Sequence, residues 1–483
     1  MNPERPKLFE SAFRVVRDFS FAEAPTTVIR SEKPPEPDGQ LERVGIKGFN
    51  LLLPIDFFES IDLGSLWSVS MEVSGHAIST NSARIVARGF TSTLERNMAG
   101  VTLSIDQFHS SETSATDQCF RRVVIPIAPK AFDSRHNQIQ LTSYRTSKHW
   151  IVSRVPLALS HGTFDMMIHH HDEEHFLILD ALQPCSLEEL LHVSHDVALT
   201  LGYITGELAQ TECFCFAYGS DAMDQWEHFS YHALRDSIKS SYAPVHANSY
   251  GYLSRDRREA ERLHPLLRAI SFAEFSSLCD RVMSDDAFAS HLLLIQESMA
   301  ASLVAMPPGL CVALEGLCRI ATSQAKKAAE KTKRVPGEAE KKDPTQEILE
   351  AFLPGARTLL EKLRSEVNKD VISLIKKKLD NIGQPTNRAQ LEAPFVELGF
   401  ALNEEDVKAI NARNRFLHGD VMLSKTEVDE ANREAFYMAL RLYCLLAVLI
   451  LKPTGYDNRI VNYPRIHAEV YGKRIEEEHF RTI

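Results

Sequence analysis

The sequence predicts a multidomain α+β protein, in which a β-rich N-terminal domain precedes an all-α helical bundle. The 483 residues exceed one ordinary domain and suggest about two or three. Short runs rich in β-branched and aromatic residues recur up to about residue 220. Helical patterns dominate from about residue 222 onward. We therefore expect a β-rich α+β domain over residues 1–220, a helical connector over 221–284 and a helical domain over 285–483.

Runs of the β type predict four early strands: Leu66–Val73, Ser82–Gly89, Val101–Phe108 and Arg121–Ile127. Apolar runs at Thr163–Ile168 and His175–Asp180 flank a polar turn, which predicts a hairpin. Ser186, with Glu189 three residues later, has the spacing of a capping box and predicts the start of a helix. A further strand is expected at Glu212–Tyr218.

The turn of the expected hairpin, His171-Asp172-Glu173-Glu174-His175, also matches His-x-x-Glu-His, an inverted zinc-protease motif. Metal chemistry of that kind needs both histidines on one face of a helix. The flanking runs are of the β type, so we interpret the segment as a solvated turn and predict no metal site.

Charge is distributed unevenly along the chain. The whole sequence has 54 Lys+Arg and 65 Asp+Glu, a net charge of −11, which excludes a strongly basic nucleic-acid coat over the whole protein. Residues 1–325 hold 27 basic and 40 acidic residues (27 − 40 = −13), whereas residues 326–483 hold 27 and 25 (27 − 25 = +2). This asymmetry indicates that the two parts meet different partners.

Motifs for other compartments and cofactors are missing from the sequence. The eight cysteines form no Cys-x-x-Cys, which argues against a disulfide framework or a zinc ribbon. The apolar run Leu442–Leu451 is about half of the ~20 residues that cross a bilayer, so it predicts a buried core helix. The first residues lack the apolar run of a secretion signal. There is no P-loop, Gly-x-Gly-x-x-Gly or Gly-x-Ser-x-Gly motif. We expect a cytoplasmic protein without a cofactor or a membrane partner.

Helical patterns over Ala287–Val304, Leu310–Lys327 and Ile348–Leu379 predict three helices, and residues 326–345 form the best linker candidate. Ser424-x-x-Glu427 is a second capping box. It predicts a helix to about Leu451, apolar nearly all round and therefore buried on more than one side.

Another helix is predicted to start at Asn403, because three acidic residues follow in its first turn. Val407, Ile410 and Leu417 form its expected apolar stripe, and Gly419 ends it.

The end of this helix, Arg413-Asn414-Arg415-Phe416-Leu417-His418, carries the residues of most chemical interest. Asn414 and His418 lie on one helical face, and Asn414 falls on the apolar stripe, where a buried amide needs a partner. Arg413 lies about 140° from His418 on an ideal helix, so the helix must distort or a second copy must contribute. Arginine suits phosphate oxygens and histidine transfers protons near neutral pH. The alternative is that these side chains only cap carbonyls and satisfy one another.

This segment resembles the signature of the HEPN superfamily, which is an arginine, a polar residue that is often asparagine, three residues and a histidine. The closing Tyr443–Leu451 with Gly455-Tyr456, and the upstream Gly309–Leu317 with its Leu-Glu pair, are similar to the ApeA-like branch. The resemblance covers roughly residues 285–460. It implies a bundle of four to five helices that forms a homodimer, with the two motifs facing each other, and it is compatible with a β-rich domain in front.

The resemblance further implies a metal-independent endoribonuclease of anti-phage defence, in which the 2′-hydroxyl of RNA, for example tRNA, attacks the adjacent phosphate. His418 would act as acid/base or orient the 2′-hydroxyl, Arg413 would stabilise charge on the phosphate, and Asn414 would hold His418. The N-terminal domain would be a sensor or regulator that responds to a phage-derived activator.

Several alternatives stay open at this point. Arg415, Lys376, Lys377 and Lys378 are candidates for contacts to RNA phosphates, although such runs usually form a solvated helix face. The helical domain could instead be a non-catalytic HEPN module that binds a nucleotide or an RNA end, or that only dimerises. It could also be a toxin silenced by a separate antitoxin.

Overall fold

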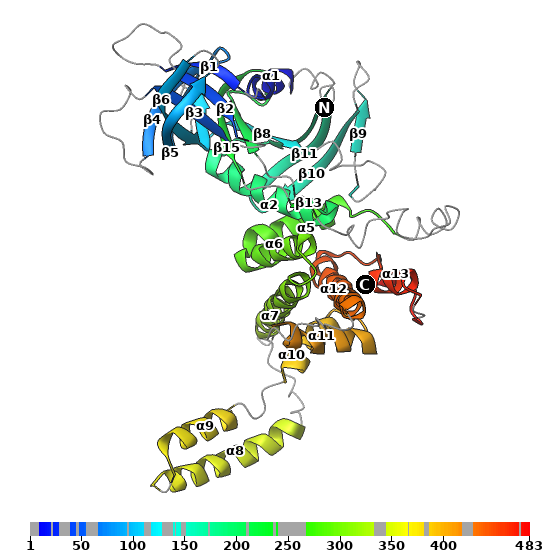
Figure 1. Cartoon of the computed structure of the whole chain (residues 1–483). Helices are drawn as coiled ribbons and strands as arrows, with labels where there is room; N and C mark the ends of the chain where they lie inside the picture. Colours follow the sequence, from blue (N-terminus) through cyan, green and yellow to red (C-terminus); the bar gives the residue numbers. More distant parts are fainter. Residues whose placement is uncertain are drawn as a thin grey trace.

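The protein, seen here in a computed structural model, has a strand-rich N-terminal part and a helical C-terminal part (Figure 1). The described residues are 9–20, 23–28, 39–44, 48–54, 66–93, 96–110, 117–127, 139–140, 142–145, 151–171, 174–208, 212–234, 238–239, 267–332, 344–365, 367–380, 386–417, 428–472 and 475–483. The predicted α+β class is confirmed.

One antiparallel sheet of 14 strands organises the N-terminal part of the described chain. Six strands close into a ring, because β4 pairs with both β1 and β5; in spatial order they are β4 (Leu66–Val73), β1 (Glu23–Val28), β2 (Gly39–Arg43), β3 (Phe49–Pro54), β6 (Arg96–Ile105) and β5 (His76–Thr93). From β5 the sheet continues through β7 (Gln107–Ser110), β15 (Trp226–Ala233), β14 (Glu212–Tyr218), β8 (Phe120–Ile127), β12 (Glu174–Ala181), β11 (Gly162–His171), β10 (Ile151–Leu159) and β9 (Thr142–Arg145).

The helix α1 (Glu10–Asp18) packs on this sheet through a core rich in phenylalanine. Phe13 stacks on Phe176 of β12 with 4.5 Å between ring centroids. Beneath α1, Arg122 of β8 and its cross-strand neighbour Asp180 of β12 form a buried bidentate ion pair, with N–O distances of 2.6 and 2.8 Å. The guanidinium also lies 4.5 Å from the ring of Phe9. A charged pair is therefore enclosed by apolar side chains in the middle of the sheet.

The helical elements are α2 (Leu187–Thr205), α5 (Phe272–Ser284), α6 (Asp286–Ala300), α7 (Met306–Thr332), α8 (Pro344–Lys362), α9 (Lys369–Asp380), α10 (Asn387–Glu397), α11 (Glu404–Leu417), α12 (Val428–Leu451) and α13 (Tyr463–Val470), with short 3₁₀ turns at Leu363–Ser365 and Lys452–Thr454. Two small two-stranded sheets pair β13 (Glu207–Leu208) with β16 (Ile238–Lys239) and β17 (Arg459–Val461) with β18 (Phe480–Thr482).

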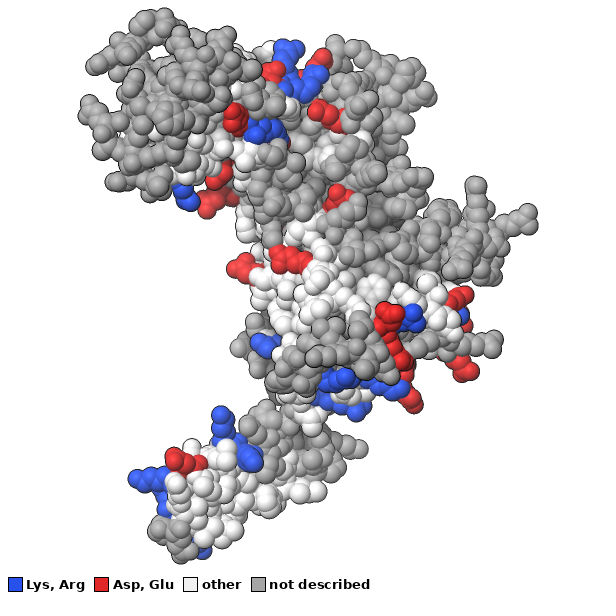
Figure 2. Space-filling model, viewed as in Figure 1, with Lys and Arg blue, Asp and Glu red and all other residues white. Residues whose placement is uncertain are grey.

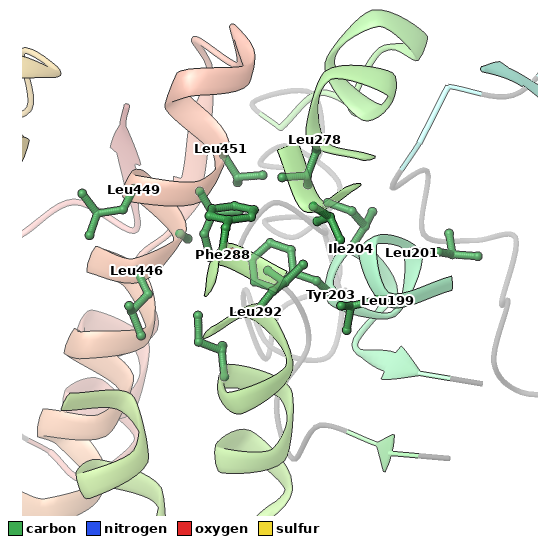
Figure 3. Close-up of a cluster of buried hydrophobic side chains, with 14 of the residues drawn as sticks. Leu199, Leu201, Tyr203, Ile204, Leu278, Phe288, Leu292, Leu446, Leu449 and Leu451 are labelled. Carbon is green, nitrogen blue, oxygen red and sulfur yellow. The ribbon is translucent and has the colours of Figure 1, made fainter. Parts of the chain in front are cut away.

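A second core runs without a break from the other face of the sheet into the helical part. Figure 3 shows its middle, where side chains of α2, α5, α6 and α12 meet. Tyr203 of α2 lies beside Leu292 of α6, and Leu451 of α12 points toward Leu278 of α5. The strand-rich and helical parts therefore share one hydrophobic core rather than a thin linker.

Several sequence predictions are confirmed by these elements. The strand predictions at Leu66–Val73 and Glu212–Tyr218 coincide with β4 and β14, and the expected hairpin is β11–β12. The capping box of Ser186 and Glu189 opens α2. The His-x-x-Glu-His segment ends one strand and begins the next, so it lacks the helical geometry of a zinc-protease motif.

Other predictions are corrected. Residues 221–284 contain the strand β15, which belongs to the main sheet, so this stretch is not wholly helical. The helix expected over Ile348–Leu379 is two helices, α8 and α9. The linker expected at 326–345 begins as helix, because α7 continues to Thr332. The capping box Ser424–Glu427 lies outside the described residues.

The apolar run Leu442–Leu451 is confirmed as a buried core segment of α12. The helical stretch Asp429–Thr454 is long and apolar enough to cross a membrane, but 83% of its most apolar part is buried inside the fold. Such burial is typical of a core helix.

Replacing Arg122 with methionine should destabilise the fold by about 3–5 kcal/mol, because it leaves the carboxylate of Asp180 buried without its partner. Urea unfolding followed by circular dichroism measures the loss. Arg388→Ala is the matched control, since its partner Glu392 is reached from an exposed position on α10 and the pair should contribute less than about 1 kcal/mol. An equal decrease in the free energy of unfolding in both variants would show that the buried ion pair stabilises the fold no more than an exposed one.

Candidate active site

The helix α11, which carries the candidate motif, starts at a reciprocal cap. The side chain of Asn403 accepts a hydrogen bond from the backbone N–H of Asp406 at 2.9 Å. The carboxylate of Asp406 accepts one from the backbone N–H of Asn403 at 3.1 Å. The predicted N-cap is therefore confirmed, and Asp406 supplies the returning partner of a capping box.

Asp406 is also the centre of a buried ionic network. Arg441 of α12 donates to its Oδ1 at 3.1 Å, and Arg481 of the C-terminal segment reaches both of its oxygens, at 2.9 and 2.6 Å. Arg441 also donates to Glu477 at 2.7 Å. Asp406 and Arg441 are fully buried. The network ties α11, α12 and the end of the chain into one unit.

Arg413 lies on the inner side of α11 and is only 6% exposed. Its Nε is 3.0 Å from Oε1 of Glu315, which lies on α7 and keeps a third of its side chain exposed. The contact has the distance of an ion pair without the alignment of a hydrogen bond. The carboxylate therefore lies beside the guanidinium at the contact between α7 and α11.

Two thiols of α7 lie within the field of this pair. Burial raises the pKa of Cys311 to about 12, and Glu315 adds to the rise while Arg413 opposes it. Burial likewise raises the pKa of Cys318 to about 12, against the opposing charge of Arg413. Both cysteines therefore stay protonated and pack as apolar side chains, which makes them poor candidates for nucleophiles.

The structure places Asn414 and Arg415 on a different side of α11 from Arg413. Asn414 and Arg415 are exposed on the outer side of α11. His418 lies outside the described residues, so its contacts with Arg413 and Asn414 stay predictions.

The lysine run Lys376, Lys377 and Lys378 lies exposed on α9, in a helical hairpin that projects away from α11 (Figure 1). Figure 2 shows Lys and Arg side chains on this hairpin and, separately, along the lower edge of the main helical part. The structure therefore does not bring the lysine run together with Arg413.

The buried face of α11 lies one residue before the apolar stripe that the sequence predicts. Leu417 and Asn414 are exposed, whereas Asp406, Ala409, Ile410, Arg413 and Phe416 are buried. Two of the buried positions are charged, and each has an ionic partner on a neighbouring segment. The prediction from apolarity alone left these two residues out of the buried face, so the predicted buried face is rotated by about 100° from the observed one.

Glu315 and Arg441 received no role from the sequence, although the sequence around each residue is unusual. Arg441 interrupts the apolar run of α12, which indicates a buried ion pair. Glu315 precedes Gly316, where an added Cβ would lie 1.9 Å from the ring of His291 on α6. Glycine thus allows α6 to approach α7 closely beside the glutamate.

No protein-family model matches the chain, and no curated protein or solved structure shows significant similarity to it.

The ionic network should make stability fall in acid. Burial alone would raise the pKa of Asp406, but its hydrogen bonds and attraction to Arg481 and Arg441 outweigh burial and lower it. The pKa of Glu477 is lowered in the same way, chiefly by Arg441 acting against burial. A carboxylate with a lowered folded pKa stabilises fully above its unfolded pKa of about 4, and the contribution is lost as the pH falls through the folded value.

We therefore expect Asp406→Asn to cost about 3–5 kcal/mol at pH 7 and clearly less at pH 3, because below its unfolded pKa of about 4 the carboxylate takes up a proton in the unfolded wild type and its contribution to stability shrinks. Urea unfolding at the two pH values measures the gap, and Asp370→Asn on the exposed face of α9 is the control. A gap that stays constant between pH 7 and pH 3 would contradict the role of the network.

Proposed function

We propose that the chain is a metal-independent endoribonuclease of the HEPN type, of the ApeA-like branch, that acts in the cytoplasm in anti-phage defence. The observation that carries the proposal is a buried arginine, held by Glu315, five residues before a histidine in Arg413-Asn414-x-x-x-His418. A fixed guanidinium suits the binding of phosphate, because less side-chain freedom is lost when the contact forms.

In the proposed reaction, the 2′-oxygen of a ribose forms a bond to the adjacent phosphorus and the bond from phosphorus to the 5′-oxygen breaks. The proton of the 2′-hydroxyl goes to a base, the leaving 5′-oxygen gains a proton, and a 2′,3′-cyclic phosphate remains. His418 serves as the acid/base or orients the 2′-hydroxyl, and Arg413 stabilises the charge on the phosphate. Asn414 orients His418. The substrate class is RNA, with tRNA as one candidate.

A homodimer through the helical domain supports this chemistry. Arg413 faces α7, whereas Asn414 faces outward on the same helix. A single copy thus presents the motif in two directions, and a second copy across the seam would supply the missing residues. The N-terminal domain would regulate the site, and the core that it shares with α6 and α12 supports such coupling.

The second candidate function is a non-catalytic HEPN module that binds a nucleotide or an RNA end, or that only dimerises. It is favoured by the inward position of Arg413, whose ion pair with Glu315 links α11 to α7. A toxin controlled by a separate antitoxin differs from our proposal only in its regulation.

Arg413→Lys separates the two functions. Lysine keeps the charge that pairs with Glu315 but lacks the planar fork of donors. We expect the variant to keep its melting temperature and to lose RNA cleavage by at least about a hundredfold, as His418→Ala should. Cleavage is measured on tRNA and mixed RNA in EDTA, with detection of cyclic phosphate ends.

Arg388→Lys on the surface of α10 is the matched control, because it makes the same exchange of arginine for lysine at an exposed position. Equal cleavage of RNA by the wild type, Arg413→Lys and His418→Ala would contradict the nuclease proposal. RNA binding without cleavage in all of these proteins would support the non-catalytic module.

A further inference from the structure

The hairpin of α8 and α9 stands apart from the rest of the helical part (Figure 1). Among the described residues the two helices pack substantially only against each other and the 3₁₀ turn that joins them. Leu360 is the one buried side chain among those that the structure describes in this hairpin. Helices of this length need an apolar face buried against a neighbour to be stable in water, so the hairpin lacks a core of its own.

Each helix of the hairpin has two apolar stripes. In α8, Leu353, Ala356 and Leu360 face α9 and are at least partly buried. A second stripe of α8 is open to solvent and consists of Ile348 (69% exposed), Phe352 (54%), Leu359 (59%) and Leu363 (38%). In α9, Ile372 and Leu379 are partly buried, whereas the open stripe consists of Val371 (43%), Leu374 (55%) and Ile375 (39%).

Both open stripes lie on the same side of the hairpin. With 100° per residue, the open stripe of each helix is offset by about 90–105° from the stripe that faces the other helix. When each helix is followed from its N-terminus to its C-terminus, the offset has the same rotational direction in α8 and in α9. Because the two helices run in opposite directions, equal offsets place both stripes on one side. The hairpin therefore presents one continuous apolar face, which we call the hairpin face, of the seven open side chains.

Charged side chains lie mainly on the opposite side. The same helical geometry places Arg357, Glu361, Lys369 and Lys377 away from the hairpin face, whereas Lys378 falls on that face near the end of α9. In Figure 2 the hairpin shows uncharged surface with Lys and Arg at its margins. Such a division into an apolar and a charged face is the pattern of a helix pair that is half of a bundle.

We propose that the hairpin face binds the hairpin face of a second copy of this chain, so that two hairpins form a four-helix bundle. The seven open side chains expose apolar surface on the order of 500 Å², near the upper limit for a monomer. This is most of the ~800 Å² that each partner contributes to a stable interface. A face that meets its own copy across a two-fold axis is complementary to itself, and the charged sides stay in water.

Gly355 lies in the middle of the open stripe of α8, with nothing within 4 Å of an added Cβ. The absence of a side chain there allows another helix to approach closely. The interface is separate from the seam expected at α11, so it does not depend on the proposed function; Leu359→Glu and a thiol at Gly355 both report on the hairpin face, and neither changes a residue of α11.

Leu359→Glu places a charge on the hairpin face and tests the proposal. Thr358→Glu is the control, because it adds the same charge at an exposed position about 100° away on the same helix. Sedimentation of the full chain over a concentration series measures dimerisation. We expect Leu359→Glu to raise the dissociation constant of the dimer at least about tenfold, because association would bury a carboxylate. Thr358→Glu should leave it unchanged, and circular dichroism should give the same helix content for both variants.

Cross-linking gives a second readout that does not depend on folding defects. All eight native cysteines are buried, so Gly355→Cys adds an accessible thiol. A short thiol-to-thiol cross-linker should join two copies through Gly355→Cys and much less through Thr358→Cys. A monomeric wild type, equal effects of the two glutamate variants, or equal cross-linking at both positions would overturn the proposal. Binding of a monomer to anionic lipid vesicles through Leu359 would assign the face to a membrane surface instead.

Discussion

The helical part depends on the burial of Asp406. A carboxylate that is fully removed from water must be paired, and the structure pairs it with arginines from α12 and from the last residues of the chain. These contacts fix both the position and the rotation of α11. Arg413 is seven residues later, two turns along nearly the same face, so the rotation that buries Asp406 also directs Arg413 toward α7. The direction of the motif arginine is therefore set at the other end of its helix.

The sequence predicted what apolar periodicity and capping chemistry can specify. Strands such as β4 and β14, the cap at Asn403 and the buried run of α12 follow from local patterns. The rotation of α11 did not follow, because Asp406 and Arg413 are buried through partners on segments distant in the chain. The prediction of a single helix over Ile348–Leu379 missed the break between α8 and α9, because the residues on each side of it have helical apolar spacing. The α+β class and the Arg-Asn segment were thus readable from the sequence, whereas the ionic partners required the fold.

The continuous core gives the regulation that we propose for the strand-rich part a physical route to the helical part. The helix α2 belongs to the face of the sheet and also packs on α5 and α6, and α6 packs on α7. Gly316 brings α7 close to His291 of α6, one residue from the glutamate that holds Arg413. Because packed cores shift between discrete arrangements rather than deform smoothly, a change at the sheet would reach α7 as a displacement of whole helices. The proposed sensor domain and the proposed reactive site therefore need no flexible connection between them.

Glu315 gives such a displacement a chemical consequence. In the proposed reaction the guanidinium of Arg413 must meet a phosphate, and the carboxylate of Glu315 is an anion 3.0 Å from its Nε. The glutamate fixes the arginine and at the same time competes with phosphate for its charge, so the balance depends on the spacing of α7 and α11. A small separation of these helices would weaken the ion pair and favour phosphate, since the interaction of a half-buried pair changes steeply with distance and solvent access. Control of the proposed nuclease would then act on a single helix contact, without any movement of the ionic network that anchors the start of α11.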